Sequence, residues 1–162
     1  MFLSIDQGTS STKACVFAPP GELVGAATVP VATEVLADGS IVQDPRELAQ
    51  SCRDAARSAL RAAGIGAEAV VGAAIANQGE SFLFMDPKGR PLTPVISWQD
   101  GGTGTVLERP ELVGHADEIT RRTGLAWHPE FVAPRATYRL EQLGIPVSVR
   151  GRLRPLLAPA LE

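Results

Sequence analysis

A short polar turn near the N-terminus carries residue types that could bind a phosphate group and a metal ion. It runs Ile5-Asp6-Gln7-Gly8-Thr9-Ser10-Ser11-Thr12-Lys13. A strand-like run ends on a carboxylate, a glycine permits a tight turn, and four hydroxyl residues precede a lysine. Backbone N–H groups and hydroxyls in such a turn can donate hydrogen bonds to phosphate oxygens. Asp6 could hold Mg²⁺, directly or through water, and Lys13 could neutralise a transferring phosphoryl group.

The same residues also fit an ordinary polar hairpin, because glycine, serine and threonine favour turns without any ligand. Both interpretations stay open on this segment alone. The segment has no GxxxxGK[ST] pattern, and we expect no helix after it, so a P-loop is excluded.

The sequence around the turn predicts the strands that must position it. Phe2–Asp6, Lys13–Ala18 and Leu23–Pro30 are typical of an antiparallel meander. Thr33–Ile41 is expected to be a loop or an edge strand.

The strongest predicted helix begins at Asp44-Pro45 and ends at Gly64. Asp44 is a good N-cap residue, and proline fits the first turn of a helix. Small and apolar residues then recur at helical spacing.

Strands and helices alternate in the rest of the chain. Val70–Ala76 is continuously apolar, which is typical of a central strand buried on both faces. The other predicted elements are strands at Ser81–Met85 and Val95–Trp98, a turn at Asp86–Gly89, and helices at Glu111–Arg122 and Pro134–Leu143. This order predicts an α/β fold, a mixed sheet flanked by helices.

Composition indicates an ordinary globular protein and excludes several classes. The 162 residues suit one domain, 44% of them are hydrophobic, and the net charge of −3 involves no long run of one sign. We therefore expect no nucleic-acid partner, no membrane partner and a cytoplasmic location. Cys15 and Cys52 are expected to be unpaired, near-core residues, and His115 and His128 lack metal-site spacing.

Four ordered segments resemble the FGGY family of carbohydrate kinases, with the glycerol kinases especially close. The first is SIDQGTSSTKACVF, and the second is IVQDPREL. The third is AAIANQGESFLFMDPKGRPLTPVISWQD, and the fourth is TRRTGLAWHPEFVAPRATYRLEQ. Together they cover residues 2–143, in the order and spacing of the family. The resemblance implies a ribonuclease H-like fold of the actin/Hsp70 ATPase type and transfer of phosphate from ATP to a sugar or polyol, with Mg²⁺.

The resemblance also implies roles for particular residues. The phosphate and ATP contacts would come from Asp6, Gly8, Thr9, Ser10, Ser11 and Lys13, with Asp6 on the Mg²⁺ side. The substrate contacts would come from Asn77, Gln78, Glu80, Trp98, Gln99 and Asp100. Each of these has an alternative as a strand-end polar residue or, for Trp98, a core tryptophan. The family's general base has no candidate here and is expected beyond the C-terminus.

Several positions depart from the family pattern. Gly79 stands where glycerol kinases have an arginine that donates hydrogen bonds to the substrate, which puts glycerol itself in doubt. Gly101 and Glu130 also differ near the presumed pocket. The sequence therefore leaves the sugar or polyol open.

The C-terminal residues depart most. Residues 146–162 contain Pro155 and Pro159 and do not resemble the family, so we expect a kinase N-terminal domain, incomplete, over residues 1–145 and an aberrant or disordered tail after it. A frameshift or premature stop would explain that tail. We expect such a fragment to be inactive alone; a separately encoded C-terminal half would restore the enzyme. The alternatives are a non-catalytic polyol- or sugar-binding module and an inert pseudogene product.

Overall fold

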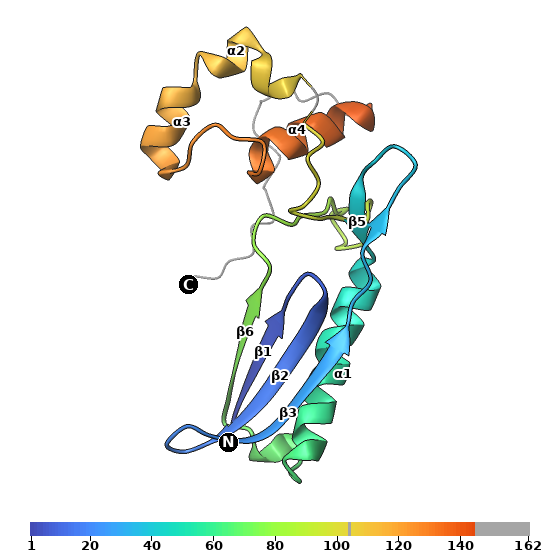
Figure 1. Ribbon diagram of the computed structural model, residues 1–162, viewed down its shortest axis with the longest axis vertical. Coiled ribbons are helices and arrows are strands. Elements are labelled where there is room, and N and C mark those ends of the chain that lie inside the picture. The colour runs from blue at the N-terminus through green and yellow to red at the C-terminus, as the bar shows by residue number, and fades with distance from the viewer. Residues whose placement is uncertain (104, 145–162) are drawn as a thin grey trace.

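A computed structural model of the chain describes residues 1–103 and 105–144. A sheet and one long helix form one end of an elongated molecule, and three shorter helices form the other end (Figure 1). The domain boundary expected at residue 145 and the tail after it lie outside the described residues.

The sheet at the N-terminal end is mixed and has four strands. Strands β1 (Phe2–Gln7), β2 (Ser11–Ala18) and β3 (Glu22–Pro30) form the predicted antiparallel meander. Strand β6 (Gly72–Asn77) runs parallel to β1, so the strand order is β3-β2-β1-β6. The turn between β1 and β2 and the end of β6 therefore lie at the same end of the sheet (Figure 1).

Helix α1 (Pro45–Ala62) covers one face of this sheet. The Asp44 carboxylate caps it by accepting a hydrogen bond from Arg46 N at 2.7 Å, as the sequence predicts. Small residues let the helix lie close to the strands: the fully buried Ala55 and Ala59 of α1 form the core with Ala14 and Val16 of β2.

Strand β6 does not have the burial that its sequence predicts. Val70–Ala76 was expected to be covered on both faces, but β6 is an edge strand, and Ile75 is 68% exposed. The reason is geometric: α1 packs across β1, β2 and β3, and within residues 1–103 and 105–144 no strand pairs with the outer edge of β6. A continuous apolar sequence predicts that a strand is buried, but the strand becomes buried only where another helix or strand covers it.

A smaller sheet follows the first. Strands β4 (Glu34–Val35), β5 (Ile41–Gln43) and β7 (Val95–Ile96) pair in the order β4-β5-β7. The edge strand considered for Thr33–Ile41 is thus β4, and the strand predicted at Val95–Trp98 is shorter than expected.

The strand predicted at Ser81–Met85 is wrong. This segment makes only two isolated bridges, Phe82 with Ile96 and Met85 with Pro91. Pro91 and the nearby Pro94 have no N–H to donate, so a continuous ladder cannot form. The predicted turn that follows is present, because Gly89 N donates to the Asp86 carbonyl at 2.9 Å.

The remaining α-helices lie in the C-terminal part of the described chain. They are α2 (Pro110–Val113), α3 (Ala116–Thr123) and α4 (Val132–Gln142), and the 3₁₀ turn η2 (Val106–Glu108) precedes them. Another 3₁₀ turn, η1 (Ala67–Ala69), lies between α1 and β6. The single helix predicted for Glu111–Arg122 is wrong, because a turn at Gly114-His115 separates α2 from α3. The helix predicted at Pro134–Leu143 corresponds to α4.

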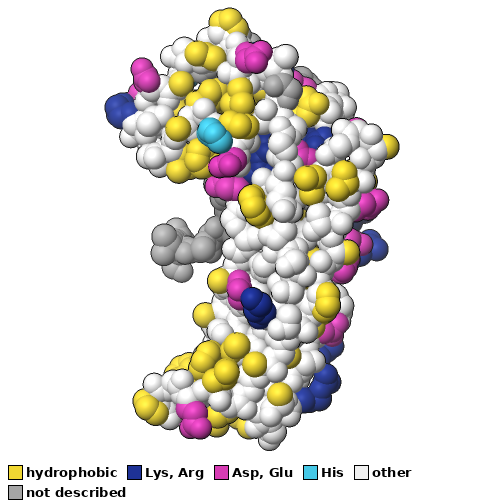
Figure 2. Space-filling view, viewed as in Figure 1, with side chains coloured by type: hydrophobic (Ala, Val, Ile, Leu, Met, Phe, Trp, Pro, Cys, Tyr) yellow, Lys and Arg dark blue, Asp and Glu magenta, His cyan; other side chains and the backbone are white. Residues whose placement is uncertain are grey.

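Hydrophobic side chains gather over the helical end and over the lower end of the sheet (Figure 2). Among the described residues, no helix has the length and apolar character needed to cross a bilayer. Cys15 and Cys52 are both free thiols of intermediate exposure.

Candidate functional site

The turn between β1 and β2 has a defined backbone. Gly8 N donates to the Ser11 carbonyl at 3.0 Å, and Val31 N donates to the Ser10 carbonyl at 3.0 Å. Asp6 and Lys13 are direct partners across the antiparallel β1/β2 pair, so their side chains share one face, and both are exposed. A carboxylate and an ammonium group therefore stand together beside the hydroxyl-rich turn.

The four hydroxyls of this turn have different surroundings. The Thr12 hydroxyl is buried against α1, 2.6 Å from Ser51 Oγ. Thr9 Oγ1 donates to Gln78 Oε1 at 3.2 Å. Ser10 is exposed and Ser11 half-buried, so these two hydroxyls are the accessible ones.

The Gln78 carboxamide joins three segments that are distant in the sequence. Its Oε1 accepts hydrogen bonds from Thr9 Oγ1 and from Ser81 Oγ, the latter at 3.1 Å. The Trp98 indole Nε1 donates to the same Thr9 hydroxyl at 2.8 Å. The predicted phosphate turn, the predicted substrate turn and the predicted tryptophan wall therefore meet at one point, which we call the Thr9–Gln78–Trp98 junction.

Gln43 supports this junction, and sequence reasoning missed it. Its side chain is almost fully buried; Nε2 donates to the carbonyls of Thr9 (2.7 Å) and Ala32 (3.2 Å), while Oε1 accepts from Gln78 Nε2 at 2.8 Å. The segment IVQDPREL resembles the family pattern, but the resemblance assigns no role to its glutamine. The available signal was the position of Gln43, a polar residue between the apolar Ile41-Val42 pair and the helix-capping Asp44.

Glu80 lies on the turn after β6 and has a left-handed backbone, with φ of 58°. Its Oε2 accepts a hydrogen bond from Val132 N, the first residue of α4, at 2.9 Å. Among residues 1–103 and 105–144, no donor is hydrogen-bonded to its other carboxylate oxygen. Asn77 is exposed at the end of β6, and its amide donates to the Gln78 carbonyl.

The three predicted residues at the end of β7 differ in exposure. Trp98 and Gln99 are exposed, whereas Asp100 is buried. Asp100 Oδ2 accepts from Ile41 N at 2.9 Å and from Arg139 Nη2 at 2.6 Å, and Oδ1 accepts from Gly102 N. Both of its oxygens thus have structural partners, and its predicted substrate contact stays a prediction.

Arg135 of α4 is the second residue that sequence reasoning did not single out. Its guanidinium is fully buried, and burial lowers the pKa of Arg135, while the charges of Glu80, Asp100 and Glu130 oppose that change. The guanidinium donates to the carbonyls of Glu80, Glu130 and Ser97. The sequence shows only an arginine near the start of a predicted helix, and arginines at such positions are usually exposed, so no signal predicted this burial.

The donors and acceptors of the turn suit a nucleotide phosphate with Mg²⁺. Among the described residues, no three His, Cys, Asp or Glu side chains cluster to hold a metal ion by themselves. One exposed carboxylate, Asp6, fits Mg²⁺ better than such a cluster would, because this ion keeps several waters and takes its other ligands from phosphates. Ser10, Ser11 and Lys13 are accessible donors that could serve the phosphate oxygens.

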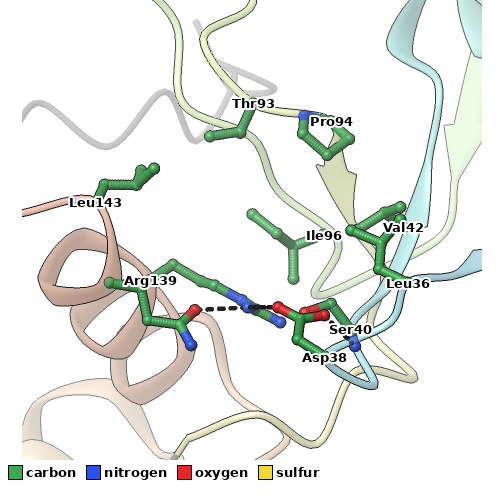
Figure 3. A pocket seen from close by; sticks show the side chains of 10 residues that line it. Leu36, Asp38, Ser40, Val42, Thr93, Pro94, Ile96, Arg139 and Leu143 are labelled. Atoms are coloured by element: carbon green, nitrogen blue, oxygen red, sulfur yellow. Dashed lines mark hydrogen bonds and ion pairs between the residues drawn. The ribbon is translucent and has the colours of Figure 1, made fainter.

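A separate cavity of about 360 Å³ lies between the β4–β5 hairpin, the segment before β7 and α4. Arg139 extends into it toward Asp38, 3.8 Å away, and Ile96 and Val42 also line it (Figure 3). None of the predicted phosphate or substrate residues lines this cavity.

The mixed sheet with a helix across one face agrees with the ribonuclease H-like, actin/Hsp70 ATPase fold that the resemblance implies. Residues 1–138 match the family described as "FGGY family of carbohydrate kinases, N-terminal domain", and the chain belongs to this family. Family and fold agree with the resemblance found in the four sequence segments.

Individual relatives give the same result. The chain is 37% identical over 142 residues to a glycerol kinase from Aromatoleum aromaticum and 39% identical over 142 residues to one from Thermus brockianus. Each match covers 87% of this chain and 29% of the relative. A solved "xyloylose kinase" from Brucella ovis superposes with a TM-score of 0.79 at 26% identity, over 88% of this chain and 29% of that one. The chain thus spans less than a third of these relatives.

Proposed function

We propose that this chain supplies the phosphate-binding turn between β1 and β2 and the substrate-binding residues around Glu80 and Trp98 of an ATP-dependent kinase. That kinase would phosphorylate a sugar or polyol. The observation that carries the proposal is the Thr9–Gln78–Trp98 junction. There, Thr9 of the β1–β2 turn is hydrogen-bonded both to Gln78 of the turn after β6 and to the exposed indole of Trp98. Polar groups beside an exposed aromatic ring suit a ligand that carries several hydroxyls on a carbon chain.

In the reaction, a substrate hydroxyl oxygen attacks the γ-phosphorus of ATP. The bond from that phosphorus to the β-phosphate oxygen breaks, ADP leaves with the electron pair, and the hydroxyl proton passes to a base. Ser10, Ser11 and Lys13 would hold the transferring group, and Asp6 would hold Mg²⁺, which lowers the charge of the phosphates when bound. Glu80 would accept a hydrogen bond from a substrate hydroxyl, and Trp98 would pack against carbon.

Further parts of the kinase must complete this site. We propose that they cover the outer edge of β6, where Ile75 and Val71 are exposed, and that they come from the same polypeptide or from a separately encoded C-terminal half. The general base belongs with them, since no described residue is assigned that role. The predicted cytoplasmic location stays a prediction.

Calorimetric titration of the full chain with glycerol, xylulose and gluconate, paired with an assay of ADP release, tests the proposal. We expect binding of at least one compound, weakened by Glu80→Gln and by Trp98→Ala. Exposed Glu22→Gln on β3 is the matched control. Absence of binding to the wild-type chain, or binding that these two substitutions leave unchanged, would contradict the proposed site. Binding without ADP release would favour the non-catalytic module.

A further inference from the structure

The guanidinium of Arg135 reaches from α4 to the backbone of both segments that carry the predicted substrate residues. Nη1 donates to the Ser97 carbonyl at 2.6 Å. Nη2 donates to the Glu80 carbonyl and to the Glu130 carbonyl, the latter at 2.8 Å. The guanidinium carbon also lies 5.5 Å from the ring centroid of Phe82.

These contacts fix the two peptide units from which the substrate side chains project. The carbonyl of the Ser97–Trp98 unit accepts from Arg135, and the N–H of the same unit donates to Ser81 Oγ at 3.0 Å. With both polar groups of that unit held, the peptide plane from which the Trp98 side chain projects is fixed, and the indole is held at its far end by the Thr9 hydroxyl. The Glu80 carbonyl, on the other segment, accepts from the same guanidinium.

Glu80 needs this support because its backbone conformation is uncommon for a residue with a Cβ atom. A φ of 58° is costly for a non-glycine residue and persists only where the surroundings hold it. Here the carbonyl is held by Arg135 and the carboxylate by Val132 N, so both contacts come from the first turn of α4.

We propose that Arg135 is a positioning residue of the substrate site. It orients Glu80 and Trp98, so that these two residues are held in place only while α4 is packed against their segments. The inference rests on the proposed function for the nature of the ligand. The alternative is a buried arginine that only fills space beside Phe82. An isosteric apolar residue would then serve as well, since apolar replacements of buried ions are often tolerated.

Hydrogen exchange on the full chain tests the positioning without any ligand. In Arg135→Met we expect the amides of Phe82 and Trp98 to exchange about tenfold faster or more, because their segments lose charge-assisted hydrogen bonds. Arg135→Lys should lie between Met and wild type, because an ammonium keeps three donors but not the planar fork. Arg109→Gln is the matched control: it removes the ion pair to Glu141 of α4 and leaves the Glu80 and Ser97 contacts intact.

Wild-type exchange rates in both Arg135 variants would overturn the proposal, as would equal acceleration in the Arg109→Gln control. If Arg135→Met fails to fold, the comparison of Arg135→Lys with Arg109→Gln decides: faster exchange at Phe82 and Trp98 in the lysine variant alone supports positioning, and equal rates refute it.

Calorimetry with glycerol and with D-xylulose forms the second readout. We expect the affinity of whichever compound binds to fall about tenfold in Arg135→Met, by less in Arg135→Lys, and not at all in Arg109→Gln. If the wild-type chain binds neither of these compounds nor gluconate, the proposed function fails, and the exchange rates still decide the role of Arg135.

Discussion

The amides of Gln43 and Gln78 form a short chain of hydrogen bonds between the phosphate turn and the substrate turn. Each amide uses its donor and its acceptor, so the chain has a single direction: Gln78 Nε2 to Gln43 Oε1, and Gln43 Nε2 to the Thr9 carbonyl. A buried polar network of this kind gives definite geometry only while every member is satisfied. The placement of Thr9 therefore depends on Gln43, which is not among the predicted phosphate or substrate residues.

Gln43→Leu should lower the free energy of unfolding by about 1–3 kcal/mol, because it leaves the Thr9 and Ala32 carbonyls and the Gln78 amide without their partner. Urea denaturation measures this change. The matched control is Gln50→Leu, on the exposed side of α1, which should change stability by less than about 0.5 kcal/mol. Equal effects at the two positions would show that the Gln43 network adds nothing to stability.

Gly79→Arg should be tolerated and should strengthen glycerol binding. A Cβ at this position would meet no atom within 4 Å, and its φ lies outside the left-handed region. Because glycerol kinases have arginine here, the added donors should raise the affinity for glycerol about tenfold. Calorimetry compares Gly79→Arg with Gly79→Ala, which adds bulk without donors. The same glycerol affinity in both variants would mean that position 79 does not face the substrate.

At the scale of elements, residue patterns predicted best where a local signal decides the structure. The Asp44-Pro45 pair predicts the start of α1, and the proline–glycine turn predicts the β2–β3 hairpin. The sequence predicted less well where the outcome depends on distant partners. The helix expected at Glu111–Arg122 divides at Gly114-His115, and the packing of α4 depends on Arg135 and Arg139, whose buried contacts leave no periodic trace.

The ion pair between Arg109 and Glu141 attaches α4 to the segment around η2, and its contribution should depend on pH. Hydrogen bonds from Arg109 lower the pKa of the Glu141 carboxyl below its ordinary value of 4.5. A carboxyl whose pKa is lowered by folding stabilises the fold above its unfolded pKa and loses that effect as the pH falls through the folded pKa. Glu141→Gln should therefore lower Tm at pH 7, and the difference in Tm should shrink as the pH falls below 4.5 and through the lowered pKa of Glu141.

Thermal scans of the wild type, Glu141→Gln, Arg109→Gln and the double variant measure this dependence. The double variant should be no less stable than Arg109→Gln, because loss of the Arg109 guanidinium already breaks the pair. A difference in Tm between wild type and Glu141→Gln that persists unchanged at low pH would argue against the ion pair as its source.

At the scale of the whole molecule, the sequence predicted which residue types form the site but not how they share their contacts. Thr9 lies in the first family segment, and Gln78 and Trp98 lie 20 residues apart in the third; the structure joins all three. Asp100 came from the same reasoning, yet its carboxylate faces Arg139 and backbone amides. A motif states that a residue type is required, whereas the direction of its side chain follows from packing between elements such as α4 and the small sheet.

The exposed edge of β6 is the feature of the whole molecule with the clearest consequence in solution. An apolar edge strand with unpaired backbone groups is a template for association with another strand. We expect the 162-residue chain to self-associate through this edge, with sedimentation coefficients that rise with concentration. Ile75→Lys should suppress the rise at little cost to folding, since the side chain is 68% exposed. Leu23→Lys is the matched control, because Leu23 is a 54% exposed aliphatic residue on β3, the opposite edge strand. If both lysine variants sediment alike, association does not depend on β6, and the proposal that further parts of the kinase cover this edge loses its main support.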